Sequence, residues 1–205
     1  MSTIQELLRE LCPNGVEHRT LGECCTFVGG GTPSKKNKEF YEGNIPWATV
    51  RDMNRLVIQD TEFHITPEAI QRSASHLIPA GSIVISTHVG VGKACLLAQD
   101  TAINQDLKAV HPDERLLTKF LFYWFLQQAS FLESKALGST VKGLSLDFVK
   151  SLSIPLPPLP VQEEIVRRLD AMQDVVEALE NELTLRRKQY EAVRERFFAT
   201  LEAIG

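Results

Sequence analysis

Residues 152–170 read LSIPLPPLPVQEEIVRRLD, and they divide the chain into two parts of different character. Four prolines lie within residues 155–160. Because proline cannot continue a helix interior or join a central strand, this segment is predicted to be a stiff, extended connector. On this interpretation residues 1–154 form one domain and residues 161–205 form a long helix.

The segment after the prolines carries a regular apolar repeat. Its large apolar side chains follow one another at spacings of 3, 4 or 7 residues, a heptad seam that is broken once at Arg186. Such a helix of about 40 residues would be about 60 Å long, too long to pack wholly against one domain. We therefore expect a coiled coil with a partner helix; the alternative is a helix folded back on its own domain. The predicted pairing residues are Ile165, Leu169, Met172, Val176, Leu179, Leu183, Tyr190, Val193 and Phe197.

The part before the prolines is predicted to be rich in β-structure. Short β-branched runs alternate with turn residues, which is typical of strands. Helices are expected at residues 3–11, 67–73 and 118–135, and the last of these is apolar nearly all round, which predicts burial inside the domain. The predicted fold class is α+β. Strands are predicted at residues 24–28, 46–50, 56–58, 62–65, 82–87, 94–98 and 107–111.

Composition and charge favour a soluble protein with a local basic patch. The chain has 205 residues and a net charge of −4, which argues against general nucleic-acid affinity. Residues 35–55, however, hold five basic and three acidic side chains, and a local patch can bind phosphate. No apolar run reaches the ~18 residues of a membrane span. Residues 1–15 lack the apolar stretch of a signal peptide, so we expect a cytoplasmic protein.

Neither a metal site nor a cofactor site is predicted. Cys12, Cys24, Cys25 and Cys95 form no C-x-x-C pair, and the five histidines form no H-E-x-x-H motif. We expect the thiols to be reduced and mostly buried.

Three short motifs resemble catalytic signatures but lack essential parts. FVGGG at residues 27–31 fits a methyltransferase cofactor loop, yet it leads into a turn rather than a helix, and no N-P-P-Y-type tetrapeptide occurs. HVGVGKA at residues 88–94 lacks the first glycine and the final hydroxyl of a P-loop, and a hairpin turn is the better interpretation. DLK at residues 106–108 lacks the further acidic residues that hold Mg²⁺ in nucleases. The sequence therefore predicts a binding module rather than an enzyme.

Three longer stretches resemble a known family in order. Residues 21–54 are similar to the opening of a target recognition domain in the specificity (S) subunits of type I restriction-modification systems, with G-G-T-P-S at residues 30–34 and I-P-W at residues 45–47. Residues 65–110 resemble the next stretch of that domain, and residues 151–170 resemble its junction with a long conserved helix. The resemblance covers about residues 5–200.

The resemblance implies a non-catalytic DNA-binding role. S subunits of this family place methyltransferase (M) and restriction (R) subunits on a two-part sequence of double-stranded DNA, and the paired helices set the gap and dock M. This chain resembles half of such a subunit, so the implied partner of its helix is a second copy and the implied target is an interrupted palindrome. Two alternatives stay open: a coiled-coil adaptor that binds M without specific DNA recognition, and the recognition domain of a fused restriction-methyltransferase.

Polar side chains on the predicted turns are the candidate DNA contacts. Lysine and arginine hold phosphate, whereas asparagine, glutamine and arginine pair with base edges. Trp47 is expected to anchor the loop after the glycines. Each candidate contact has an alternative interpretation: the lysines are solvated surface charges that bind nothing, and Asn104 caps a turn. The candidate contacts are Lys35, Lys36, Asn37, Lys38, Thr49, Arg51, Asn54, Thr87, His88, Lys93, Asn104, Gln105, Ser139, Thr140 and Lys142.

Overall fold

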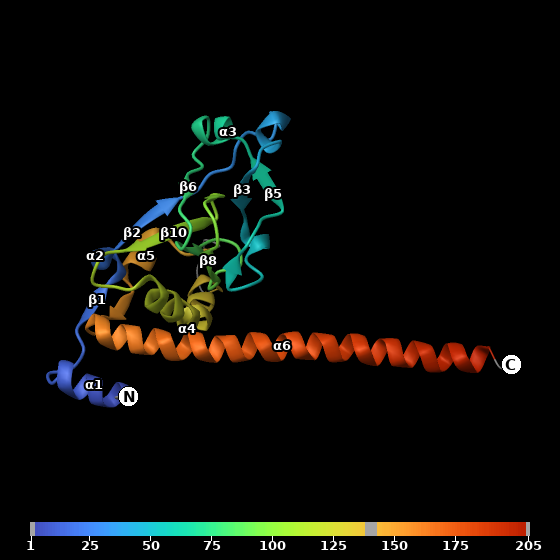
Figure 1. Cartoon of the computed structure of the whole chain (residues 1–205). Helices are drawn as coiled ribbons and strands as arrows, with labels where there is room; N and C mark the ends of the chain where they lie inside the picture. The colour runs from blue at the N-terminus through green and yellow to red at the C-terminus, as the bar shows by residue number, and fades with distance from the viewer. Residues whose placement is uncertain (1–2, 138–142, 204–205) are drawn as a thin grey trace. The chain divides into compact units, whose positions relative to one another are not determined.

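A computed structural model describes residues 3–137 and 143–203 of the chain, which divides into the units Met1–Glu164 and Ile165–Gly205 (Figure 1). The helices of the first unit are α1 (Ile4–Leu11), α2 (Leu21–Cys24), α3 (Pro67–Gln71), α4 (Thr118–Leu137) and α5 (Leu146–Ser151), with the 3-10 helices η1 (Lys38–Tyr41) and η2 (Val50–Asp52). Helix α6 (Leu159–Glu202) begins in the first unit and makes up most of the second.

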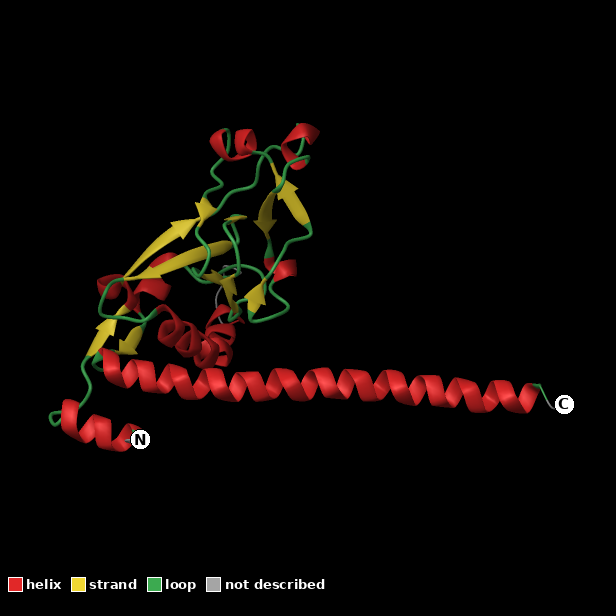
Figure 2. Cartoon of the chain, viewed as in Figure 1, coloured by secondary structure: helices red, strands yellow, loops and turns green. Residues whose placement is uncertain are grey.

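The strands of the first unit form three sheets (Figure 2). The five-stranded sheet has the order β2-β10-β7-β8-β4, the four-stranded sheet has the order β5-β3-β9-β6, and β1 pairs with β11. Pairs β3/β9 and β4/β8 are parallel, and the other pairs are antiparallel. The strands are β1 (His18–Thr20), β2 (Cys25–Gly29), β3 (Ile45–Ala48), β4 (Val57–Ile58), β5 (Phe63–Ile65), β6 (Leu77–Ile78), β7 (Ile83–Ser86), β8 (Ala94–Leu97), β9 (Thr101–Ile103), β10 (Leu107–Pro112) and β11 (Ser153–Pro155).

The main core takes side chains from both large sheets. Val84, Leu97 and Leu107 come from the five-stranded sheet, and Ala48 and Ile103 come from the four-stranded sheet. A second cluster, which includes Phe40 and Trp47, packs where η1 and α3 meet the four-stranded sheet. The ends of the strands, from which the loops leave both sheets, are therefore held by the packed core.

The α+β prediction is confirmed, and each of the seven predicted strands is present. Strands β1, β6, β9 and β11, each of two or three residues, were not predicted. The hairpin interpretation of the Gly-Val-Gly stretch is also confirmed, since β7 and β8 pair antiparallel on either side of it.

The proline segment is shorter than the connector expected at residues 155–160. Pro155 pairs with His18 in the β1–β11 ladder, and α6 already begins at Leu159. Gln162 of α6 is fully buried, and its side chain joins three backbone groups: the amide N–H of Leu117 and the carbonyls of Arg115 and Pro157, at 2.8–2.9 Å. The first turn of α6 is thus part of the first unit.

Helix α4 is less enclosed than its composition predicted. Phe120, Leu121 and Phe125 are buried, but Phe131 is 42% exposed. The helix packs one face against β8 and β10. The prediction of an internal helix was therefore wrong for the face that carries Phe131.

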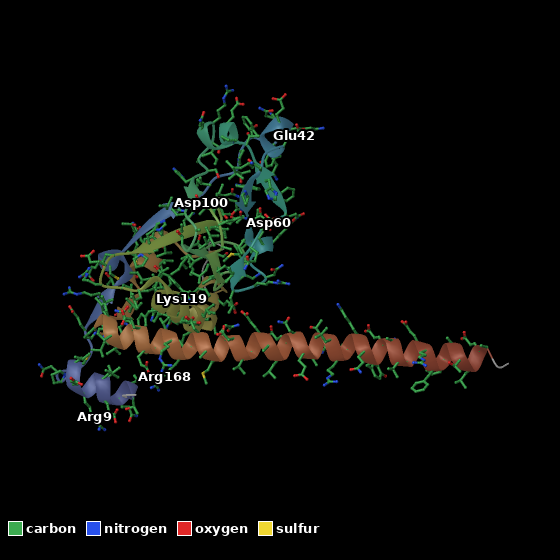
Figure 3. All side chains as sticks on the ribbon, in the orientation of Figure 1. Arg9, Glu42, Asp60, Asp100, Lys119 and Arg168 are labelled. Atoms are coloured by element: carbon green, nitrogen blue, oxygen red, sulfur yellow. The ribbon has the colours of Figure 1, made fainter. Side chains whose placement is uncertain are left out.

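In the second unit α6 runs without interruption to Glu202, and Figure 3 shows side chains projecting on both sides of its ribbon. The predicted pairing residues from Met172 to Phe197 are exposed. Among the described residues, no helix is long and apolar enough to cross a membrane.

Candidate nucleic-acid interface

The glycine run at residues 29–31 allows a close approach between backbones. A Cβ on Gly30 would lie 2.2 Å from the carbonyl oxygen of Ile103, and one on Gly31 would lie 2.5 Å from the carbonyl carbon of Ala74. Such distances exclude any side chain, so only glycine permits this packing. The run is therefore a packing feature of the loop.

The loop at residues 30–37 is fastened to the β-sheet by hydrogen bonds. The amide of Gly31 donates to the Ile103 carbonyl at 3.0 Å, and the Trp47 indole donates to the Gly31 carbonyl at 3.1 Å. The Tyr41 hydroxyl donates to the Pro33 carbonyl at 2.8 Å. Trp47 is itself 5% exposed, and its ring contacts those of Tyr41 and Phe63 edge to face. The structure thus gives Trp47 the anchoring position that the sequence predicted.

Next to this loop the surface has a hollow of about 630 Å³, which we call the loop hollow. Three cationic side chains and one carboxylate line it, together with aromatic rings and two valines. Six of its residues were candidates from the sequence: Lys35, Lys38, Thr49, Arg51, Asn104 and Gln105. Seven were not: Thr32, Tyr41, Trp47, Val50, Phe63, Val89 and Asp106.

The cations at the hollow differ in how they are paired. Lys35 and Lys38 are exposed, and neither side chain makes a hydrogen bond or ion pair with any part of the chain that the structure describes. Arg51 is also exposed, but its guanidinium lies 3.4 Å from the carboxylate of Glu62. The two lysines are thus free to meet an anion such as phosphate.

The turn between β9 and β10 forms another part of the lining. The Asn104 side-chain oxygen accepts a hydrogen bond from the Asp106 amide at 3.1 Å, and its nitrogen donates to the Asp106 carboxylate at 3.0 Å. The Lys108 ammonium donates to the Gln105 carbonyl at 2.8 Å. Burial lowers the pKa of Lys108, and the nearby Asp106 carboxylate opposes this change. The backbone of the turn is therefore held on both sides of Gln105.

Three of the candidate DNA contacts make hydrogen bonds within the protein. Thr87 is 1% exposed, and its backbone bonds to Asp106 and Leu144, so the prediction that its side chain contacts DNA was wrong. The Thr49 hydroxyl caps η2 and bonds with the Asp52 carboxylate. Asn104 caps its turn, as the alternative interpretation held.

The other candidates lie outside the lining of the hollow. His88 and Lys93 are exposed in the β7–β8 hairpin, and Lys36 and Asn54 are exposed on their loops. Asn37 precedes η1 and is half-buried. Ser139, Thr140 and Lys142 lie outside the described residues.

Phe63 and Val89 are the functional candidates that the sequence did not suggest. Phe63 is 39% exposed and Val89 is 59% exposed, although both are large apolar side chains. The signal for Val89 was an apolar residue flanking the glycine of a predicted hairpin turn. Phe63 gave no such signal, because it sits in an ordinary strand pattern.

The thiols show no sign of a reactive or metal-binding site. Burial raises the pKa of Cys24 and Cys25, and it raises the pKa of Cys95 to about 12. Cys24 and Cys25 sulfurs lie 3.9 Å apart as free thiols. In the described ranges, no three His, Cys, Asp or Glu side chains converge as metal ligands would.

Comparison with known proteins decides the family. The model of the type I restriction modification DNA specificity domain matches residues 13–185. The chain belongs to this family. The resemblance found in the sequence is thereby confirmed, and the loop hollow lies within the matched part of a type I specificity chain.

Curated relatives are about twice as long. This specificity chain is 37% identical over 195 residues to the Type I restriction enzyme EcoR124I/EcoR124II specificity subunit of Escherichia coli, covering 90% of this chain and 48% of that one. It is 28% identical to the MjaIX specificity subunit of Methanocaldococcus jannaschii, covering 73% of this chain and 36% of that one. The chain thus spans about half the length, or less, of these relatives.

A solved structure shows the same fold. The HsdS subunit from Thermoanaerobacter tengcongensis superimposes with a TM-score of 0.64 at 24% identity, covering 87% of this chain and 44% of that one. The shared fold includes the β-rich unit and a long helix.

Proposed function

We propose that this chain is a non-catalytic, half-length specificity subunit that reads double-stranded DNA with the loop hollow. The observation that carries the proposal is the pair of free lysines, Lys35 and Lys38, on a hydrogen-bonded loop beside exposed amide and apolar side chains. Lysines hold phosphate, whereas side chains inside the hollow contact base edges. The family assignment supports DNA as the ligand of this domain.

The proposal includes a homodimer formed by α6. From Met172 to Phe197 its heptad seam is exposed, and an exposed apolar seam on a charged helix is stable only with a partner. A second copy of the chain supplies an identical seam. Relatives twice as long have room for two such units in one chain.

The charges of α6 favour an antiparallel pair. Residues 163–182 hold seven acidic and two basic side chains, whereas residues 183–202 hold five basic and three acidic ones. Beside the seam, Glu180 and Glu182 lie in the acidic half, and Arg187 and Arg194 lie in the basic half. Antiparallel pairing places the acidic half of one copy against the basic half of the other, whereas parallel pairing sets each half against the same half of the other copy.

This arrangement has a consequence for the DNA target. Two recognition units related by a two-fold axis read two copies of one half-site in inverted order. The target is therefore an interrupted palindrome, and the paired helices fix its gap. The same dimer positions M subunits and, through them, R subunits on the DNA.

A gel-shift experiment with purified M subunit tests the DNA-reading part. We expect the chain and M together to retard one DNA sequence far more strongly than a scrambled competitor. Binding of M without sequence-specific retardation would contradict the proposal and favour an adaptor that occupies M without reading DNA.

A further inference from the structure

The loop hollow contains one amide group that is held in place and still able to bind a ligand. Gln105 stands on a turn whose backbone is fixed by Lys108, which donates to its carbonyl at 2.8 Å, and by the Leu107 amide, which donates to Asn104 at 3.2 Å. Its side chain is exposed and receives a hydrogen bond from the Thr32 hydroxyl. This hydrogen bond restricts the side chain, so that less freedom is lost on binding.

The Gln105 side chain can still form hydrogen bonds to a ligand. Thr32 uses one lone pair of the amide oxygen, which leaves the second. In the part of the chain that the structure describes, no group accepts a hydrogen bond from its amide nitrogen. Gln105 thus offers one acceptor lone pair and, beside it, an amide NH2 group with both N–H donors open.

Its neighbours in the hollow are already engaged. The guanidinium of Arg51 faces Glu62 at 3.4 Å, and the carboxylate of Asp106 accepts from Asn104 at 3.0 Å. Because Arg51, Asp106 and Asn104 already have partners, Gln105 is the lining amide best able to choose between bases.

Two apolar side chains line the same hollow. Phe63 and Val89 come from β5 and from the β7–β8 hairpin, and both are substantially exposed. Exposed large apolar groups inside a hollow with a cationic rim suit a ligand that carries both phosphate and a methyl group. Thymine is the base with a methyl group in the major groove of DNA.

We propose that the loop hollow receives the major-groove edge of one A·T base pair. The Gln105 amide donates to adenine N7 and accepts from adenine N6, while Phe63 and Val89 contact the thymine methyl group. Guanine fits worse because its N7 and O6 are both acceptors, so O6 would face the amide oxygen. Lys35 and Lys38 neutralise flanking phosphates. This inference rests on the proposed DNA-reading function and adds the identity of one base pair.

The experiment is selection from random duplex DNA with the full chain and purified M subunit, followed by sequencing. We compare the wild type with Gln105→Ala, Gln105→Glu and the control Gln99→Ala, which removes an exposed glutamine outside the hollow. The wild type and the control should enrich a motif with an invariant A·T pair. Gln105→Ala should lose preference at that pair alone and bind the wild-type motif about tenfold more weakly.

Gln105→Glu separates base reading from a loss of folding. Glutamate only accepts hydrogen bonds, so preference at the same pair should move toward cytosine, whose N4 is a donor. On the selected site, 7-deazaadenine at that position should weaken wild-type binding about tenfold, and uracil in place of thymine should weaken it about fourfold.

The outcomes distinguish the two proposals. If the wild type enriches a motif and both Gln105 variants enrich the same motif, the assignment of Gln105 is overturned while the DNA-reading function stands. If the wild type enriches no motif, the DNA-reading function is overturned, and this inference falls with it.

Discussion

The indole nitrogen of Trp47 lies 3.1 Å from the carbonyl oxygen of Gly31 and donates a hydrogen bond to it. This bond links the buried end of β3 to the loop that carries Lys35 and Lys38. It therefore connects the packing of the core to the geometry of the proposed DNA-reading surface. The motifs G-G-T-P-S at residues 30–34 and I-P-W at residues 45–47 contain the two ends of this link.

Replacing Trp47 with phenylalanine should loosen that loop. The variant Trp47→Phe removes the indole donor and leaves a buried carbonyl unpaired, which lowers the free energy of unfolding by about 1–2 kcal/mol. DNA affinity should fall as well, because the lysines lose their fixed positions. Trp124→Phe is the matched control in α4, where the described chain offers the indole no hydrogen bond. Equal effects of the two substitutions on denaturant unfolding and on DNA binding would contradict this role of Trp47.

Removal of the free lysines should weaken binding without changing specificity. The double variant Lys35→Ala/Lys38→Ala should lose affinity for all sequences alike, and the slope of log K against log salt should become shallower by about 1–2. Lys150→Ala/Lys188→Ala changes the net charge equally but lies outside the hollow, so its slope should match the wild type. Titrations at several salt concentrations measure both quantities. A changed base preference in the first variant would place these lysines on bases rather than on phosphates.

Charge reversal on α6 tests the direction of helix pairing. In an antiparallel dimer, Glu180→Lys/Glu182→Lys sets two basic halves against each other and should raise the dimer Kd about tenfold. Adding Arg187→Glu/Arg194→Glu should restore the wild-type Kd, because both halves are then reversed. Sedimentation equilibrium at low salt measures these constants. An unchanged dimer Kd in the first variant would contradict the antiparallel pair; a parallel pair would lose only the contact between Glu182 and the partner's Arg187, so its Kd would rise less.

The sequence predicted features that depend on neighbours along the chain. The heptad seam from Ile165 to Phe197 and the strand at residues 82–87 are regular patterns, and both were found as a helix and a strand. The anchoring of the loop by Trp47 followed from an apolar residue after a proline. These elements arise from local periodicity, which a single sequence displays.

The set of residues that lines the loop hollow could not be predicted from local patterns in the sequence. Phe63 and Gln105 lie in different strands and turns, and only the sheet topology brings them to one surface. Thr87 was predicted to contact DNA because it flanks a glycine-rich hairpin, yet it is 1% exposed, and its hydroxyl donates to the Asp106 carbonyl at 3.3 Å. Contacts between residues distant in sequence decided which polar side chains reach the surface.

The most direct test of DNA reading by a homodimer is a selection experiment. The purified full chain with M subunit selects DNA from a random pool, and the selected DNA is sequenced. A homodimeric reader should enrich one motif made of two identical half-sites in inverted order, separated by a gap of constant length. An asymmetric two-part motif would contradict recognition by a homodimer, and the absence of any enriched motif would contradict DNA reading by this chain.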